Sequence, residues 1–176
     1  ITNQSIPIGF QQKRPTFEID DCGNITITNC TFYCCYTTTQ YGGGLLIKSN
    51  VTAILHNCIF DSCRTEYHGG GGAIGTSFDF NGENPIIGDI KKLDIQYTCF
   101  SNCYQNNINH GFGSALLMSA VDVIFFYAST VNCPSLYRAH GAQFDIQATN
   151  SITSQYVNAT GGNSEFCGAM EYRRAV

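Results

Sequence analysis

The sequence predicts an all-β protein, a single-stranded parallel β-helix of about five rungs. Three observations support this class. The chain contains 16 Thr, 15 Asn and 18 Gly, a mixture that suits strands and turns better than helices. A Phe-x-x-Cys motif recurs at nearly regular intervals. Apolar residues alternate with polar ones before each copy, and no useful length of the chain has helical periodicity.

The repeat appears when the segments NCTFYCC (29–35), NCIFDSC (57–63) and YTCFSNC (97–103) are aligned. The alignment superposes one phenylalanine and one cysteine from each copy: Phe32, Phe60 and Phe100, and Cys35, Cys63 and Cys103. The cysteine column continues weakly through Cys133 and Ala159, with copies 28, 40, 30 and 26 residues apart. One copy cannot bury its own apolar face, so the copies must stack, with rungs about 4.8 Å apart.

Each copy has a strand before the phenylalanine and another after a glycine corner. The first strand is indicated by apolar pairs two residues apart, such as Ile25 with Ile27 and Leu93 with Ile95. The second begins at a small or apolar residue preceded by Gly or Ser: Leu45, Ala73, Ala115, Ala142 and Ala169. Glycine suits this corner because it permits positive φ and close backbone approach. The run GGGGAIG (69–75) therefore belongs to the repeat, and no Lys-Ser/Thr follows it as in a phosphate-binding loop.

Residues 1–24 are predicted to form a partial first rung, and residues 25–176 the repeats. The longest interval is explained by an insertion within 76–92, whose Asn-Gly, Asn-Pro and Gly-Asp steps predict a surface loop. The odd Phe-x-x-Cys spacing requires a bend between the two residues, since residues on one face of a strand lie two apart. Neither end shows a polar cap, so we expect the solenoid to continue beyond this chain or to be covered by a partner.

The motifs GGLL (43–46), GGAI (71–74) and GSAL (113–116), combined with FYCC, FDSC and FSNC, resemble the GGA[ILV] and F-x-x-N repeats of chlamydial polymorphic membrane proteins. Similar repeats occur in surface proteins of protists such as trichomonads. The resemblance covers roughly residues 17–172 and implies a right-handed parallel β-helix and a role as a cell-surface adhesin. Cysteine stands where the family has asparagine, so the resemblance implies a cysteine ladder here.

Ten cysteines without paired zinc spacing indicate an oxidising compartment. Stacked cysteines are either small buried hydrophobes or disulfides, because the separation between rungs fits disulfide geometry. The candidate disulfides are Cys30–Cys58, Cys35–Cys63 and Cys103–Cys133. Four further cysteines have no assigned partner: Cys22, Cys34, Cys99 and Cys167.

Five Asn-x-Ser/Thr acceptors for N-linked glycans support the same compartment: Asn3, Asn24, Asn29, Asn50 and Asn158. We therefore expect an extracellular or cell-surface glycoprotein. The formal net charge of −4, with nine scattered Lys and Arg, excludes nucleic acid as a partner. No apolar stretch reaches the roughly 18 residues of a membrane span.

The sequence predicts no cofactor, no metal site and no catalytic residue. His68 and His110 should stack near a corner, but Gln40 and Tyr137 occupy that column in neighbouring copies, which leaves no third metal ligand. The acids Asp61, Asp94 and Asp122 fall in different columns. Neither Asp145 nor Glu171 is expected to have an acidic neighbour, as a glycosidase pair would require.

These observations favour a non-catalytic β-helix used as a rigid stalk or adhesin, which presents a binding face to a receptor, a glycan or another copy of itself. The insertion at 76–92 is the best single candidate for a specific contact. Two alternatives stay open: a carbohydrate-active β-helix enzyme of the polysaccharide lyase or hydrolase type, and a structural subunit of an extracellular filament or coat.

Overall fold

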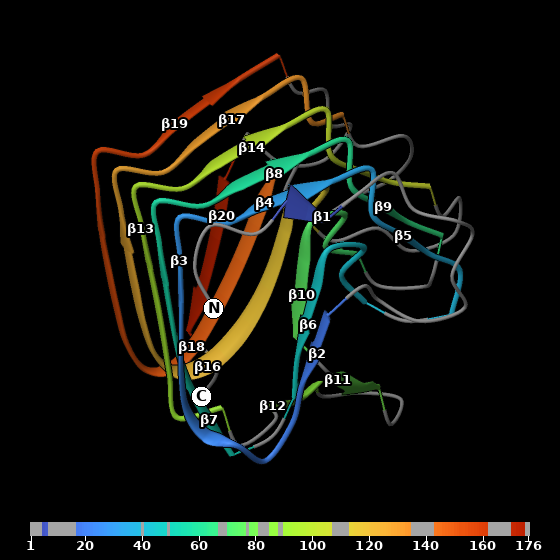
Figure 1. The fold of residues 1–176 in the computed structure, drawn as a ribbon. Coiled ribbons are helices and arrows are strands. Elements are labelled where there is room, and N and C mark those ends of the chain that lie inside the picture. Colours follow the sequence, from blue (N-terminus) through green and yellow to red (C-terminus); the bar gives the residue numbers. More distant parts are fainter. Residues whose placement is uncertain are drawn as a thin grey trace.

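The computed structural model describes the chain over residues 5–6, 17–39, 41–48, 50–66, 70–76, 78–80, 85–87, 90–106, 113–134, 143–161 and 170–174. Within these ranges the chain forms strands, turns and bends but no helix, and the strands wind into a parallel β-helix (Figure 1). No helix in the described part could therefore cross a bilayer. The predicted fold class is confirmed.

The coil has three main walls, which we call the first, second and third wall in chain order. The first wall contains short strands in the early rungs and the leading halves of two long strands later: β2 (Phe17–Ile19), β6 (Leu45–Ile47), β10 (Ile74–Thr76), β16 (Leu116–Phe126), β18 (Phe144–Gln155) and β20 (Met170–Arg174). The second wall contains the trailing halves of β16 and β18 together with β3 (Gly23–Thr28), β7 (Val51–His56) and β13 (Lys92–Gln96).

The third wall carries the phenylalanine motif. In Figure 1 its strands lie in successive layers along one side of the coil: β1 (Ser5–Ile6), β4 (Thr31–Tyr33), β8 (Ile59–Asp61), β14 (Cys99–Ser101), β17 (Ser129–Val131) and β19 (Asn158–Thr160). A small parallel sheet follows it, made of β5 (Tyr36–Thr37), β9 (Arg64–Thr65) and β15 (Tyr104–Gln105). Every pairing in these sheets is parallel, as expected when each strand stacks on its equivalent one turn later.

Single residues in the left-handed backbone region make the corners of the third wall. The predicted bend between phenylalanine and cysteine is confirmed, since Cys34, Ser62, Asn102 and Asn132 occupy it with φ between 50° and 56°. The corner between the second and third walls uses the same device, with φ between 50° and 54°, at Asn29, Asn57, Tyr97, Tyr127 and Tyr156. One left-handed residue reverses the side-chain alternation there, so both flanking strands can face the core.

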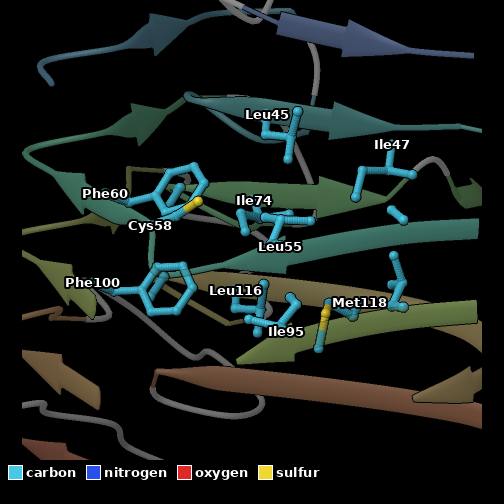
Figure 2. Packing of buried hydrophobic residues seen from close by; sticks show 14 of the residues in the cluster. Leu45, Ile47, Leu55, Cys58, Phe60, Ile74, Ile95, Phe100, Leu116 and Met118 are labelled. Carbon is cyan, nitrogen blue, oxygen red and sulfur yellow. The ribbon is translucent and has the colours of Figure 1, made fainter. Parts of the chain in front are cut away.

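Like residues stack inside the coil, most clearly in the phenylalanine column of three consecutive rungs. The rings of Phe32 and Phe60 are parallel at 4.5 Å between centroids, and those of Phe60 and Phe100 follow at 5.3 Å. Figure 2 shows Phe60 and Phe100 pointing into the same interior as Leu55 and Ile95. Burying each such side chain contributes about 1.5–3 kcal/mol. The predicted stacking of these phenylalanines is confirmed.

The glycine corner is confirmed, but its expected register is wrong by one residue in the first copy. Leu45 pairs with Ile74 rather than with Ala73, and the amide of Gly43 donates to the carbonyl of Gly72 at 2.9 Å. Gly72 in turn donates to Ser114 at 2.8 Å, and a Cβ on Gly72 would lie only 2.3 Å from the carbonyl oxygen of Ser114. Glycine is required there because the backbones of successive rungs approach too closely for a side chain.

The insertion at 76–92 contains two short strands of its own. β11 (Phe78–Phe80) and β12 (Pro85–Ile87) pair antiparallel and form a hairpin outside the repeating coil. Thr76 still belongs to β10, and Ile90 is already buried in the core before β13 begins. The excursion from the coil therefore lies between Thr76 and Ile90.

Candidate binding surface

The expected glycan acceptors lie on the outside of the coil wherever the structure describes them. Asn24, Asn29, Asn50 and Asn158 are all exposed, and Asn3 falls outside the described residues. Two of these side chains have partners: Asn50 donates from Nδ2 to Asp21 at 2.6 Å, and Asn29 accepts from Asn57. Occupancy by sugar stays a prediction.

The cysteines form two buried columns inside the coil. One contains Cys30 and Cys58, and the other contains Cys35, Cys63, Cys103 and Cys133. Several of the described cysteines donate from Sγ to a carbonyl of the preceding rung, as Cys63 does to Phe32 at 3.4 Å. Burial raises the pKa of the Cys58 and Cys103 thiols, which keeps them protonated at neutral pH.

The three candidate disulfides would link cysteines of consecutive rungs. Cys30 and Cys58 directly precede the paired residues Thr31 and Ile59, and the amide of Cys103 lies 3.3 Å from Sγ of Cys133. The three disulfides stay predictions. The mass of the non-reduced chain tests them, because each disulfide removes two hydrogen atoms. Cys22 and Cys99 are exposed, Cys34 is half-buried, and Cys167 lies outside the described residues.

Two of the described acids, Asp61 and Asp122, accept hydrogen bonds from neutral donors. Asp61 accepts hydrogen bonds from Ser101 at 2.8 Å, Ser62 at 3.1 Å and Asn102 at 3.2 Å. Partial burial raises the pKa of the Asp61 carboxyl, but these hydrogen bonds together lower it below its usual value. Asp122 accepts from Ser151 and Asn150 on the next rung, and these bonds lower its pKa too.

One expectation about the acids is wrong. Asp145 on β18 pairs in register with Glu171 on β20, so two acidic residues occupy consecutive rungs of one column. The error follows from anchoring the fourth copy on Ala142, which shifted its column by one residue. Asp145 is fully buried and lies 3.4 Å from Nε2 of Gln147.

The histidine column lies outside the described residues, together with Gln40 and Tyr137. Among the residues that the structure does describe, no three His, Cys, Asp or Glu side chains gather as metal ligands would. We therefore turn to the exposed side chains of the outer surface as candidates for binding.

A ladder of three tyrosines is the most distinctive feature of that surface. We use the name tyrosine ladder for Tyr97, Tyr127 and Tyr156, which occupy the corner between the second and third walls on successive rungs. Their rings stack almost parallel, with centroids 4.8 Å apart for the first pair and 4.7 Å for the second. They remain 48%, 46% and 70% exposed, so the stack lies on the surface instead of filling a core.

The backbone under the ladder is unusual for tyrosine. Each ladder residue has φ between 50° and 54°, a conformation that costs an L-residue other than Gly, Asn or Asp about 1–2 kcal/mol. The same column carries Asn29 and Asn57 in the earlier rungs, where asparagine tolerates this conformation and Asn57 donates to Asn29 at 2.6 Å. Tyrosine therefore occupies positions that asparagine would fit with less strain, and such strain often accompanies function.

Other exposed or partly exposed side chains lie on the two walls that meet at this corner. On the second wall, His56 makes an edge contact with Tyr97 at 5.0 Å, and Phe126 is only partly buried. On the third wall, Ile59 and Val131 are 46% and 47% exposed. Exposed rings that lie together, as the three tyrosines do, mark interaction sites more often than scattered ones do.

The sequence contained a signal for the ladder. In the alignment of copies, Tyr97 stands over Asn29, three residues before the phenylalanine, and Tyr127 and Tyr156 stand at the same place in later copies. Among the described residues, the tyrosine ladder is the surface feature best suited to bind a ligand. No protein-family model, no curated protein and no solved structure matches the chain.

Proposed function

We propose that the chain is a non-catalytic extracellular or cell-surface glycoprotein, a rigid β-helix stalk or adhesin that binds a receptor or glycan through the tyrosine ladder. The observation that carries the proposal is the stacked, exposed ladder on strained backbone. The exposed sequons support the extracellular location. The resemblance to chlamydial polymorphic membrane proteins and protist surface proteins supports an adhesive role and is part of the proposal.

The ladder suits recognition because it is preorganised. Tyrosine offers a large amphipathic contact area at low cost in side-chain entropy, which is why binding surfaces use it often. Stacking fixes the three rings before any ligand arrives, so little further entropy is lost on binding. Because neighbouring rings cover both faces of Tyr127, that residue meets a ligand through its ring edge and hydroxyl.

The test is binding of the purified chain to an array of cell-surface glycans and extracellular-matrix proteins, before and after Tyr127→Gly. Glycine tolerates the left-handed backbone and avoids the new sequon that an asparagine at this position would create with Ser129. We expect a loss of at least about tenfold in affinity, the usual effect of removing a central aromatic anchor. Tyr33→Ser, an exposed tyrosine on the third wall, is the matched control and should bind normally. Unchanged binding by Tyr127→Gly would contradict the proposal.

One observation favours the carbohydrate-active enzyme instead. The register pair Asp145 and Glu171 places two carboxyl-bearing residues on neighbouring strands, and glycoside hydrolysis uses paired carboxylates. The full burial of Asp145 argues against access by a polysaccharide. Release of reducing ends or unsaturated products from a panel of polysaccharides, abolished by Asp145→Asn, would replace the adhesin proposal with this one.

A further inference from the structure

The tyrosine ladder holds the phenol rings of consecutive rungs face to face. The rings of Tyr97 and Tyr127 are 4.8 Å apart between centroids at an angle of 5°, and those of Tyr127 and Tyr156 are 4.7 Å apart at 9°. The three residues share one backbone conformation, so equivalent carbon atoms of neighbouring rings lie about one rung, roughly 4.8 Å, apart. Phenols on separate molecules meet only by diffusion, whereas these phenols are already in contact.

The phenols of the ladder are also accessible to reagents in solution. Tyr97 and Tyr127 remain 48% and 46% exposed although their rings stack on each other. Tyr127 has a ring on both of its faces, so its exposed part includes the ring edge and the hydroxyl group. The ring edge carries the two carbon atoms that are ortho to the hydroxyl group. These are the carbon atoms at which an oxidised phenol forms new bonds.

Contact and accessibility together suit oxidative coupling of two tyrosines. A one-electron oxidant removes an electron and a proton from a phenol and leaves a phenoxyl radical, whose unpaired electron is shared between the oxygen and the ortho carbons. Two such radicals join most readily when they are held together, because no encounter by diffusion is needed. We propose that Tyr127 is a site of dityrosine formation, where a peroxidase that consumes hydrogen peroxide joins it to a neighbouring ring of the ladder in the same chain.

The atoms and electrons of this step balance. Hydrogen peroxide accepts one electron and one proton from each of the two phenols and is reduced to two molecules of water. The new bond joins one ortho carbon of each ring. The hydrogen atom on each of these carbons then moves to the oxygen of its own ring, which restores both phenols. The linked pair has therefore lost two hydrogen atoms, and no other residue has changed.

Three other described tyrosines lack a phenol on the next rung of their column. Tyr33 is 40% exposed, but it pairs in register with Asp61. Tyr36 and Tyr104 are separated by Arg64, whose guanidinium lies 4.2 Å from the centroid of the Tyr36 ring and donates from Nη1 to the Tyr104 hydroxyl at 2.9 Å. Tyr33 is therefore the matched control, an exposed phenol without a stacked partner on the following rung.

The experiment is oxidation of the purified full chain, at micromolar concentration, with a haem peroxidase and hydrogen peroxide. Thiols that react in the folded chain are first blocked by alkylation, because the exposed Cys99 lies two residues after Tyr97 and a thiol competes for phenoxyl radicals. Dityrosine is detected by its fluorescence. Peptide mass spectrometry of the monomer then identifies the two joined peptides, whose combined mass is lower by two hydrogen atoms.

The decisive variant is Tyr127→Phe, which keeps the stacked ring but has no phenol to oxidise. We expect it to lower the yield of the link within one chain at least about tenfold, because Tyr97 and Tyr156 are two rungs apart and no longer have a phenol between them. The double variant Tyr97→Phe/Tyr156→Phe isolates Tyr127 and should have the same effect. Tyr33→Phe should form the link as the wild type does.

Three results would overturn this inference. The first is the absence of dityrosine from the oxidised wild type. The second is dityrosine that occurs only in covalent dimers, which would show that coupling takes place between chains. The third is a link within the chain that survives in Tyr127→Phe. The test uses no ligand, so any of these results leaves the proposed binding function untouched, and a chain that binds no receptor or glycan can still form the link.

Discussion

Asn57 donates a hydrogen bond from Nδ2 to Oδ1 of Asn29 on the preceding rung, in the same column that carries Tyr97 on the following rung. The column thus changes from an asparagine ladder to a tyrosine ladder at one step of the coil. Both ladders use the same left-handed backbone, and they differ in what they present to the outside.

Replacing Tyr97 by asparagine should extend the asparagine ladder at little cost in stability. The change relieves about 1–2 kcal/mol of backbone strain and loses stacking on Tyr127 worth about 0.5–1.5 kcal/mol. We expect the free energy of unfolding in urea to stay within about 1 kcal/mol of the wild type. Tyr97→Val, which puts a β-branched residue at φ 50°, should be clearly less stable. A valine variant as stable as the asparagine variant would contradict the assigned backbone.

Phe60 should contribute more to the free energy of unfolding than the adjacent Ile59. It is fully buried between Phe32 and Phe100, so Phe60→Ala removes two ring contacts and leaves a cavity that the flanking rungs hold open. We expect a loss of about 3–5 kcal/mol in chemical denaturation. Ile59→Ala, at an outward position, should change stability by less than about 0.5 kcal/mol. Equal effects of the two substitutions would mean that the third wall has the opposite face inward.

Alanine should be tolerated much less at Gly72, in the glycine corner, than at Gly23, at the start of β3. Gly72→Ala would bring a Cβ to 2.3 Å from the carbonyl oxygen of Ser114 and 2.6 Å from that of Tyr104, both of them backbone atoms. The rungs must separate to accept it, so we expect a loss of more than about 2 kcal/mol or failure to fold. At Gly23 a Cβ would meet nothing within 4 Å, and Gly23→Ala should lose only the roughly 1 kcal/mol of its positive φ. Circular dichroism melts of the two variants check the contrast.

Asp61 should make stability depend on pH in the acid range. Its folded pKa is lowered, so its contribution is fully present above the ordinary Asp pKa of about 3.9 and is lost as pH falls through the folded value. Asp61→Asn removes that contribution. We therefore expect the urea midpoints of the wild type and the variant to differ at pH 6 and to converge as the pH falls through the lowered folded pKa of Asp61. A gap that widens on acidification would show that the carboxyl pKa is raised in the folded chain.

The interior of this fold was predictable from the sequence because its columns repeat residue identity. Phe32, Phe60 and Phe100 each stand three residues before a cysteine. This shared spacing gives the register of the third wall that the structure has. The glycine corner was less certain, since Leu45 and Ala73 are both apolar residues after a glycine. The backbone hydrogen bonds between the two corners, such as that from Gly43 to Gly72, determine which residues pair.

The candidate site was harder to predict, for a physical reason. Tyrosine disfavours the left-handed region, so nothing in its propensity places Tyr97, Tyr127 and Tyr156 at a corner. The alignment places them in one column, but only the left-handed corner of the coil shows that their rings lie outside and stack. The pairing of Asp145 with Glu171 was missed for a related reason, because a one-residue shift in the fourth copy moved every position that followed the corner.

The separation of inward from outward columns has a consequence for how such a protein changes over generations. Duplication of a rung copies both columns, and the buried copy must keep its shape to fit its neighbours. The corner residue is not constrained in this way, since the same column holds Asn57 on one rung and Tyr97 on the next. Outward corner positions can therefore be substituted on one rung at a time, while the buried columns keep their residues.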